Sequence, residues 1–270
     1  MSELVWYERH LAGFENRLKH EDRVKDKVAE SLAVKGRTVA EATKLIPDAI
    51  RYTFQYHEAD YSRHLQEDIA LMQQRSSDLV RLRNFLPGDQ YKGISSLWSH
   101  RDTGQLFETQ FHTEFSYEVM LFTAERSYAR LRSAQTCAQE EIELEAFQRK
   151  IYAHVPVPPG ANDIPGYPAD ADQGIPGRRA HEGSVPDGVT YYAIVDDLSS
   201  RDRPAGVLRR SYRGGRRDEA FTQDLVWHRS SLLASAERGD LENEFVEITA
   251  EEASRIVNRI RQFATSKPRQ

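Results

Sequence analysis

Three polar side chains at every second position of one segment could give a strand a chemically active face. Glu108, Gln110 and His112 alternate there with two phenylalanines and a threonine. Because successive side chains of a β-strand point to opposite faces, the acid, the amide and the imidazole share one face, and the other face can pack. Such a row is also typical of a strand face that is only solvated, and the pattern alone supports both interpretations.

The elements around this segment must hold it in place. Residues 91–98 (YKGISSLW) and the segment itself alternate in polarity on either side of a turn that contains Asp102, Thr103 and Gly104. This pattern predicts a β-hairpin, and the run that follows it, up to Arg132, has helical character. The polar row would therefore lie on the second strand of a hairpin that leads into a helix.

Three short motifs in this region resemble those of a known enzyme family. Residues 108–113 (ETQFHT) are similar to the E-x-Q-[IF]-[RH]-T strand of RelA/SpoT-type nucleotide pyrophosphokinases, the alarmone synthetases. Residues 91–95 (YKGIS) stand where that family has Y-[KR]-[SAG]-[LI]-H, and residues 49–51 (AIR) resemble the end of its D-x-x-G-[IV]-R strand. The motifs follow the family's order, and the resemblance covers residues 23–132, about half of the chain.

The resemblance implies transfer of the β,γ-pyrophosphate of ATP to the 3′-hydroxyl of a purine nucleotide, with Mg²⁺ as cofactor. It assigns Glu108 to the metal and to activation of the hydroxyl, and Gln110 to orientation of the hydroxyl. The family's other metal ligand lies five residues before the arginine that corresponds to Arg51, where this chain has Ile46. Asp48 is the predicted replacement, so Asp48 and Glu108 are the expected metal pair and, with Gln110, the expected catalytic residues. An aspartate after a proline is also a common turn residue.

The same resemblance implies the nucleotide contacts. Tyr91 is expected to stack on the acceptor base. His112 would take the place of an arginine near phosphate, and Ser95 replaces the family's histidine, which would alter acceptor recognition. The full set of predicted nucleotide-binding residues is Arg23, Lys25, Arg51, Arg81, Arg83, Tyr91, Lys92 and His112.

The cations outside the three motifs have two interpretations. Arg81 and Arg83 share one face of a predicted strand, where they would meet solvent or hold a polyphosphate. The segment that the family uses to grip the donor ATP contains Arg23, Lys25, Lys27 and Lys35, and a solvated helix face would have the same composition.

Hydrophobic periodicity gives the other elements of the first half. Gly36 is expected to end a helix, and Thr38-x-x-Glu41 is a capping box that starts the next one. The further predicted elements are helices at 4–18, 24–32 and 60–74 and strands at 48–56 and 78–85. Their order predicts an α+β fold with a mixed β-sheet flanked by helices, and the resemblance implies the nucleotidyltransferase-like synthetase fold.

The second half has a different character. A helix is expected at 140–152, and the proline- and glycine-rich stretch after it predicts a linker or an ordered surface loop. Alternating segments beyond the stretch predict a small antiparallel β-sheet, followed by a C-terminal helix. The inner face of that helix would consist of Ala253, Ile256, Val257, Ile260 and Phe263. The expected domains are a RelA/SpoT-like pyrophosphokinase domain at 1–153, a linker at 154–188 and a small α+β module at 189–270.

A basic run in the second half has an open interpretation. It comprises Arg209, Arg210, Arg213, Arg216 and Arg217. The run could contact RNA, or it could belong to a solvated hairpin, because acidic residues surround it.

Composition narrows the functional classes. The 270 residues carry a formal net charge of -5, which argues against a protein that coats nucleic acid. No apolar run approaches 18 residues and the first residues lack the apolar core of a signal peptide, so we expect a cytoplasmic protein without membrane spans. The single cysteine, Cys137, excludes an internal disulfide and a cysteine-based zinc cluster.

Three functions remain open from the sequence. The first is Mg²⁺-dependent pyrophosphate transfer from ATP to a purine nucleotide, with the C-terminal module regulating or inhibiting the enzyme through contact between the two domains. The second is a catalytically silent nucleotide-binding or interaction protein of the same fold. The third is a toxin that pyrophosphorylates the 3′ end of tRNA.

Overall fold

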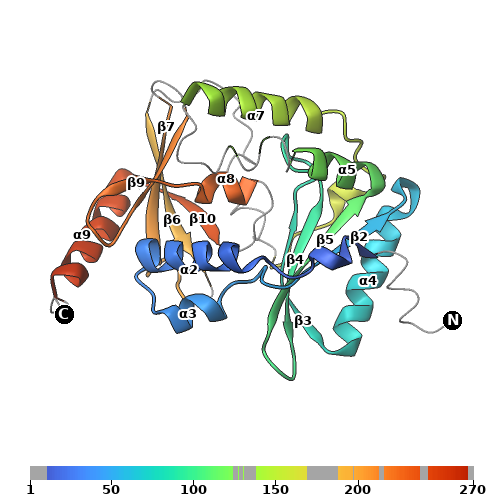
Figure 1. The fold of residues 1–270 in the computed structure, drawn as a ribbon, viewed down its shortest axis with the longest axis horizontal. Coiled ribbons are helices and arrows are strands. Elements are labelled where there is room, and N and C mark those ends of the chain that lie inside the picture. Colours follow the sequence, from blue (N-terminus) through green and yellow to red (C-terminus); the bar gives the residue numbers. More distant parts are fainter. Residues whose placement is uncertain are drawn as a thin grey trace.

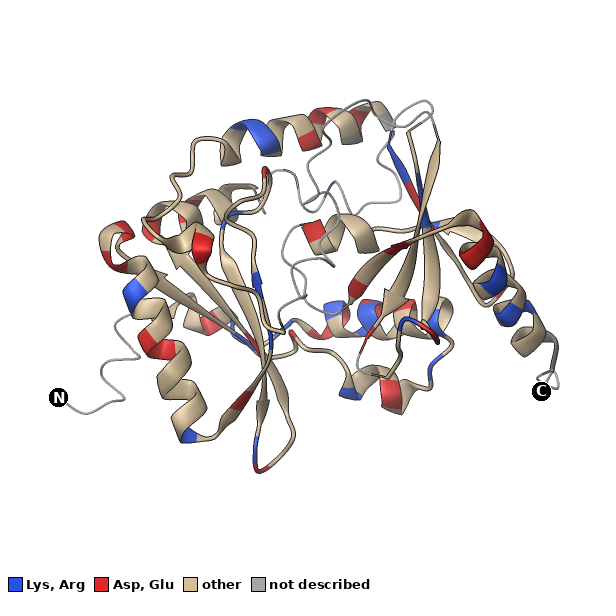
Figure 2. Ribbon diagram, turned by 180° about the vertical axis from the view of Figure 1, so that it is seen from behind, with Lys and Arg blue, Asp and Glu red and all other residues tan. Residues whose placement is uncertain are grey.

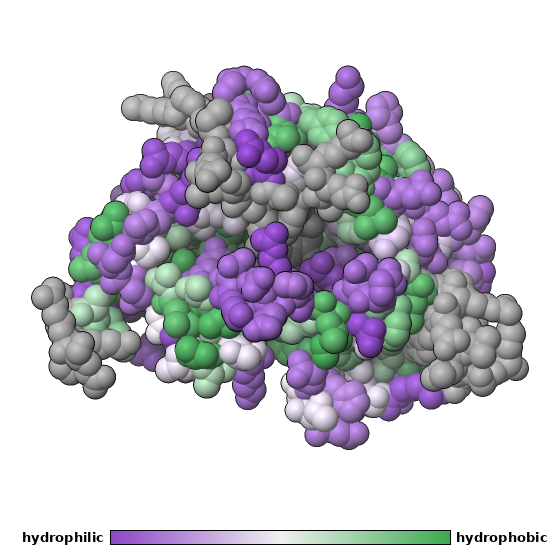
Figure 3. Space-filling view, viewed as in Figure 1, coloured by the Kyte–Doolittle hydropathy of each residue, from purple (hydrophilic) through white to green (hydrophobic). Residues whose placement is uncertain are grey.

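Two five-stranded sheets lie side by side in the part of the chain that the structure describes (Figure 1). The structure is a computed structural model, and it describes residues 11–123, 127, 130, 138–168, 188–196, 198–212, 216–237 and 243–266. Hydrophilic residues cover most of the face seen in Figure 3, and hydrophobic residues form smaller patches between them. Within the described residues, no helix has both the length and the apolar character needed to cross a membrane.

The first sheet is mixed, as predicted. Its strands are β1 (Leu11–Ala12), β2 (Arg51–Tyr56), β3 (Ser77–Asn84), β4 (Ile94–His100) and β5 (Leu106–Thr113), in the order β1-β2-β5-β4-β3. β2 and β5 are parallel, and the other neighbours are antiparallel. The predicted hairpin is formed by β4 and β5. Gly104 in its turn has a φ of 67°, a left-handed conformation that glycine adopts without strain.

One face of this sheet packs against α4 (Tyr61–Arg75), which confirms the predicted helix. The rings of Phe54 in β2 and Phe111 in β5 stack with centroids 5.4 Å apart, and Tyr61 and Leu65 of the helix cover them. Burial of each large apolar side chain contributes about 1.5–3 kcal/mol. This core fixes β2 beside β5 and so determines which side chains meet on the opposite face.

The predicted helices around Gly36 are confirmed. α2 (Glu21–Lys35) ends at Gly36, whose φ is 66°. α3 (Val39–Lys44) begins with the predicted capping box, in which Thr38 and Glu41 each accept a hydrogen bond from the other's backbone N–H. α5 (Glu114–Thr123) and α7 (Ala138–Tyr152) confirm the helices expected after the hairpin and before the linker, over the residues described there.

The helix predicted at 4–18 is wrong where the structure describes it. Leu11–Ala12 forms β1, which pairs with β2, and Phe14–Asn16 is a 3-10 turn. Gly13 lies between them with a φ of 59°, and such a left-handed backbone interrupts a helix. Leu11 still packs against the first core, which accounts for part of the apolar spacing. Residues 4–10 lie outside the described residues.

The second sheet is antiparallel throughout its described strands, as predicted. These are β6 (Val189–Val195), β7 (Gly206–Ser211), β8 (Arg217–Phe221), β9 (Trp227–Arg229) and β10 (Glu244–Ile248), in the order β10-β6-β7-β8-β9. Two helices accompany them, α8 (Leu232–Glu237) and α9 (Ala250–Ser266). We call residues 188–266, so far as they are described, the second module.

Each face of the second sheet has its own core. Ala253, Ile256, Val257 and Ile260 of α9 are buried on one face, as predicted. Phe263 is 65% exposed, so its assignment to the inner face was wrong: the helix extends beyond the sheet surface that it covers. On the other face, Leu233 of α8 packs together with Val34 of α2. α2 therefore lies across the second sheet although it belongs to the N-terminal part of the chain (Figure 1).

The beginning of the predicted linker is packed against the first sheet. Ala161 and Ile164 join the first core, and their carbonyl oxygens accept hydrogen bonds from the side-chain amide of Asn84, at 2.7 and 3.1 Å. Tyr167 forms a β-bridge with Leu82. The predicted division into domains stays a prediction, and the described part of the linker is ordered against β3.

A buried acid in the first core makes stability depend on pH. Asp68 of α4 is fully buried, and its carboxyl accepts a hydrogen bond from the hydroxyl of Tyr56. Burial raises the pKa of Asp68 to about 7. Between about pH 4 and pH 7 the folded protein therefore keeps a proton that the unfolded chain has lost, and the free energy of unfolding falls as pH rises through this window.

Asp68→Asn removes this ionisation. The wild type loses stability between about pH 4 and pH 7, and the variant does not. The difference in free energy of unfolding, variant minus wild type, is therefore expected to increase over this range and then to level off. Urea denaturation across this range measures it, with Asp26→Asn, an exposed aspartate of α2, as the control. A difference that is the same at every pH would contradict the assignment.

Candidate functional site

The site residues predicted in the first sheet lie on the face opposite α4, in two neighbouring rows. Residues paired directly across strands lie side by side on one face, and the next row is two residues further along each strand. The register gives one row of Arg51, Glu108, Leu97 and Arg81, and a second row of Thr53, Gln110, Ser95 and Arg83. We call these two rows the polar face. The strand pairing thus brings together five predicted residues that come from β2, β3 and β5: Arg51, Arg81, Arg83, Glu108 and Gln110.

Arg51 connects the two predicted metal ligands. Its Nε lies 2.8 Å from Oε2 of Glu108, and a terminal nitrogen of the same guanidinium lies 3.0 Å from Oδ2 of Asp48. Both carboxylates are buried, whereas 37% of the Arg51 side chain is exposed. Asp48 belongs to the turn before β2, and Glu108 lies directly across from Arg51 in β5. The two acids therefore meet around one guanidinium.

Two lysines complete this group. The Nζ of Lys19 lies 2.5 Å from Oδ2 of Asp48, and the Nζ of Lys27 in α2 lies 3.1 Å from Oδ1. We call Lys19, Lys27, Asp48, Arg51 and Glu108 the ion cluster. Three cations face two buried carboxylates, so the cluster carries one surplus positive charge. A surplus of this sign favours an anionic ligand.

The acids of the ion cluster do not fit Mg²⁺ in this arrangement. Mg²⁺ requires a nearly octahedral shell of oxygen ligands at about 2.1 Å. Here Lys19, Lys27 and Arg51 occupy the oxygens of Asp48, Arg51 occupies one oxygen of Glu108, and the amide of Gln110 donates to the other at 3.0 Å. Among the described residues, no three or more His, Cys, Asp or Glu side chains converge on one point. Mg²⁺ stays a prediction.

His112 and Tyr91 form a buried pair beside the polar face. Nε2 of His112 lies 2.8 Å from the Tyr91 hydroxyl, and Nδ1 lies 2.9 Å from the hydroxyl of Ser116. Burial lowers the pKa of His112 to about 3, so the imidazole is neutral near pH 7. A Cβ at Gly93 would lie 2.9 Å from both the imidazole and the Tyr91 hydroxyl, so this pairing requires glycine there. In this structure His112 holds Tyr91 and supplies no positive charge.

Three other predicted nucleotide-binding residues lie outside the polar face. Lys92 donates to the carbonyl oxygens of Leu86 and Gly88, each at 2.5 Å, and so closes the loop between β3 and β4. Arg23 and Lys25 lie on the exposed side of α2, where Arg23 pairs with Asp26 and Lys25 with Glu21. The structure does not bring these three cations to the polar face, and their contact with a nucleotide stays a prediction.

The second module reaches the polar face through Arg83. This arginine is fully buried, and its guanidinium donates to the carbonyl oxygen of Asn243, just before β10, at 3.0 Å. Arg81 is half-buried in the neighbouring row. The contact between the two halves that the sequence led us to expect is therefore present at a predicted site residue.

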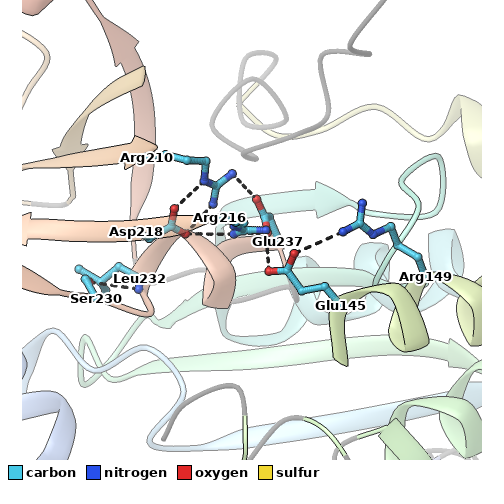
Figure 4. A network of polar contacts seen from close by, with 8 residues as sticks. All are labelled: Glu145, Arg149, Arg210, Arg216, Asp218, Ser230, Leu232 and Glu237. Carbon is cyan, nitrogen blue, oxygen red and sulfur yellow. Dashed lines mark hydrogen bonds and ion pairs between the residues drawn. The ribbon is translucent and has the colours of Figure 1, made fainter. Parts of the chain in front are cut away.

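A second contact between the halves is a buried ionic network (Figure 4). Arg216 pairs with Asp218 of β8 and Glu237 of α8, at 3.0 and 2.7 Å, and with Glu145 of α7 at 3.0 Å. Arg210 of β7 binds the same two acids of the second module. α7 lies above both sheets in Figure 1, and Arg216 attaches it to the second one. Three arginines of the basic run, Arg209, Arg210 and Arg217, also pair with acids, and Arg213 lies outside the described residues.

Sequence reasoning did not single out Lys19, and it named Lys27 only among the cations of a segment that could grip ATP. Lys27, Ser31 and Val34 are the buried residues of α2, at helical spacing of four and three. The same periodicity, applied without the assumption that lysine faces water, would have placed Lys27 on the inner side. Lys19 precedes the helix and carries no such signal.

Comparison with known proteins gives matches to solved structures only. No family model matches the chain, and no curated protein matches its sequence. A structure of smu.1046c from Streptococcus mutans UA159 matches at 18% identity with a TM-score of 0.39, over 51% of this chain and 69% of that one. Small alarmone synthetase 1 from Bacillus subtilis matches at 15% identity with a TM-score of 0.40, over 55% and 78%. A GTP pyrophosphokinase family protein from Streptococcus pneumoniae matches at 14% identity with a TM-score of 0.33, over 51% and 67%. The matched proteins include alarmone synthetases, the family that the motifs resemble, and we infer no activity from likeness at this level.

Lys27→Met tests the ion cluster as a structural unit. The variant keeps most of the side-chain volume but removes one of the three cations around a buried carboxylate, and we expect it to lower the free energy of unfolding by about 1–3 kcal/mol. Lys25→Met, two residues away on the exposed side of the same helix, should change it by no more than about 0.5 kcal/mol. Urea denaturation of both variants measures the difference, and equal effects would contradict the buried position of Lys27.

Proposed function

We propose that the protein transfers pyrophosphate from ATP to the 3′-hydroxyl of a purine nucleotide, with the polar face as the site of transfer. The observation that carries this proposal is the position of Arg51, Glu108 and Gln110 side by side on one face, with Asp48 joined to them through Arg51. The motif resemblance supports it independently, because three of these four residues lie in the resembling segments.

The reaction assigns a role to each of these residues. The 3′-oxygen forms a bond to the β-phosphorus of ATP, the bond from that phosphorus to the oxygen bridging the α-phosphorus breaks, and AMP leaves. Glu108 accepts the hydroxyl proton, and Gln110 orients the hydroxyl from the adjacent row. Arg51, Arg81 and Arg83 are the cations placed to stabilise the charge that develops on the phosphoryl oxygens.

Arg51 is the residue that an incoming nucleotide reaches first. It is the most exposed member of the ion cluster, and both carboxylates behind it are buried. A phosphate group can accept both of its hydrogen bonds in place of the carboxylates. Movement of the guanidinium to phosphate would free the oxygen of Glu108 that now accepts from Nε, and the acid would then be able to act as a base. Mg²⁺, the cofactor that the resemblance implies, would have to compete with the same cations, and no step above depends on it.

Tyr91 requires a second rearrangement. Its ring packs at 82° against Phe85, and its hydroxyl is bonded to His112. Stacking on an acceptor base would need the ring to leave this position. If the polar face is the site of transfer, this arrangement of Tyr91 and Arg51 is a closed state of the enzyme.

The second module is proposed to maintain this closed state. It contacts the polar face through Asn243 and holds α7 through Arg216. α2 also links the second module to the ion cluster. Val34 packs against the second sheet together with Leu233 of α8, and Lys27 on the same helix binds Asp48. Regulation or inhibition by the second module would follow from these three contacts.

A catalytically silent nucleotide-binding protein is the second candidate. The observation that favours it is the set of three cations on Asp48, which leaves this acid without an oxygen for a metal ion. Such a protein would bind ATP at the surplus positive charge and transfer nothing.

Glu108→Gln separates the two candidates. The variant keeps the shape of the side chain and loses the base, so transfer is expected to fall by at least about a hundredfold. The assay follows label from γ-labelled ATP, with Mg²⁺, to ATP, GDP, GTP or tRNA offered separately, and Glu118→Gln on the exposed side of α5 is the control. Label on tRNA alone would identify the toxin-like acceptor. No label on any acceptor, with ATP binding intact, would contradict the transferase and support the silent protein.

Glu145→Gln tests control by the second module. The variant weakens the tie between α7 and Arg216 but leaves Arg216 its two acids within the second module. If this tie helps to keep the site closed, the transfer rate should rise severalfold above that of the wild type. Glu143→Gln on the exposed side of α7 is the matched control. Equal rates for the two variants would contradict control through this contact.

A further inference from the structure

A pocket lies away from the polar face, where the end of α2 meets the second module. It has a volume of about 510 Å³, and its lining includes Arg37, Leu198, Arg203, Pro204, Arg259 and Phe263. Lys35 and Gly36, at the end of α2, contribute to the same wall. The volume is in the range that accommodates a nucleotide-sized molecule.

Most charges around this pocket are already paired. Lys35 and Arg37 both bind Asp196, Lys35 at 3.4 Å. The carboxylate of Glu41 accepts hydrogen bonds from the backbone N–H and the hydroxyl of Thr38, at 2.8 and 2.7 Å. These groups hold the wall of the pocket and have little charge left for a ligand.

Arg203 and Arg259 differ from them. Among the described residues, no carboxylate lies within ion-pair distance of either guanidinium. Arg259 donates to the carbonyl oxygen of Pro204 at 2.8 Å. Burial and the nearby positive charge of Arg203 lower the pKa of Arg259 from its usual value, as expected for two close cations without an anion between them. Two guanidinium groups that line the same pocket can together bind one phosphate group.

Apolar side chains form another part of the lining. Leu198 and Phe263 are 59% and 65% exposed, and Pro204 and Ile260 belong to the same lining. Phe263 follows the residues of α9 that are buried against the second sheet. Figure 2 shows the acidic residues of α9 at its start and the basic residues further along, toward the end of the helix that lines the pocket.

We propose that this pocket binds a phosphate monoester with a flat apolar body, of the size of a nucleoside monophosphate. Arg203 and Arg259 hold the phosphate, and Leu198, Pro204 and Phe263 contact the body of the ligand. The site is distinct from the polar face, and the proposal does not depend on pyrophosphate transfer. The ligand would touch both α2 and the second module, so its binding would strengthen the contact between them.

The test measures binding of AMP to the full-length protein by calorimetry. The wild type is expected to bind AMP more tightly than inorganic phosphate or adenosine, because only AMP fills both parts of the pocket. The double variant Arg203→Gln, Arg259→Gln should bind AMP at least tenfold more weakly, because each lost charged hydrogen bond is worth about 1.5–3 kcal/mol. Phe263→Ala, at an exposed position, should weaken AMP severalfold and leave inorganic phosphate unchanged. Arg255→Gln, an exposed arginine of the same helix, is the control.

Hydrogen exchange locates the bound ligand. AMP is expected to protect peptides from 198–206 and 256–264, and this protection should persist in Glu108→Gln, which alters the polar face only. The proposal is overturned if AMP does not bind, if the double variant and Arg255→Gln bind it equally, or if protection appears only at 106–113. Equal affinity for AMP and inorganic phosphate would overturn the role of the apolar wall.

Discussion

The bridge that Arg51 forms between Asp48 and Glu108 is the interaction on which the polar face depends. Two carboxylates buried this deeply would repel each other without a cation between them, and removing one partner of a buried pair is costly. One guanidinium binds both acids, and Lys19 and Lys27 add two further cations around Asp48, which leaves one surplus positive charge. The same bridge that assembles the site also occupies the oxygens that a proton or a metal ion would need. The proposed transfer would therefore have to begin with the displacement of Arg51.

α2 couples this cluster to the second module. Lys27 and Val34 are two helical turns apart, about 10 Å along the axis. The first binds Asp48, and the second packs in the core of the second sheet. Next to Val34, the backbone N–H of Gln223 donates to the carbonyl oxygen of Ala33 at 3.0 Å. The Gln223 side chain also approaches Gly36 so closely that a Cβ at Gly36 would lie 3.0 Å from it. Because a helix transmits displacement as a rigid element, movement of the second module would carry Lys27 with it and change the charge around Asp48.

Sequence patterns predicted most of the helices and strands, because the interactions that form them join residues close together in the sequence. Strand alternation placed Glu108 and Gln110 on one face, and the capping box at Thr38 and the glycine at 36 set the ends of two helices. The failures have equally local causes, since Gly13 interrupts an apolar pattern that otherwise fits a helix. The meeting of Asp48 with Glu108 through Arg51, the contact of Lys27 with Asp48 and the contact of Asn243 with Arg83 depend on pairing between distant segments, which periodicity does not encode.

The affinity for ATP in the absence of divalent cations tests most directly whether the polar face is the nucleotide site. If the three cations around Asp48 are the groups that receive phosphate, Asp48→Asn releases them and should bind ATP severalfold more tightly than the wild type. Arg51→Gln should bind it more weakly. If Asp48→Asn binds ATP no more tightly, or if Arg51→Gln binds it as well as the wild type does, the cations of the ion cluster are structural and the polar face is not the nucleotide site.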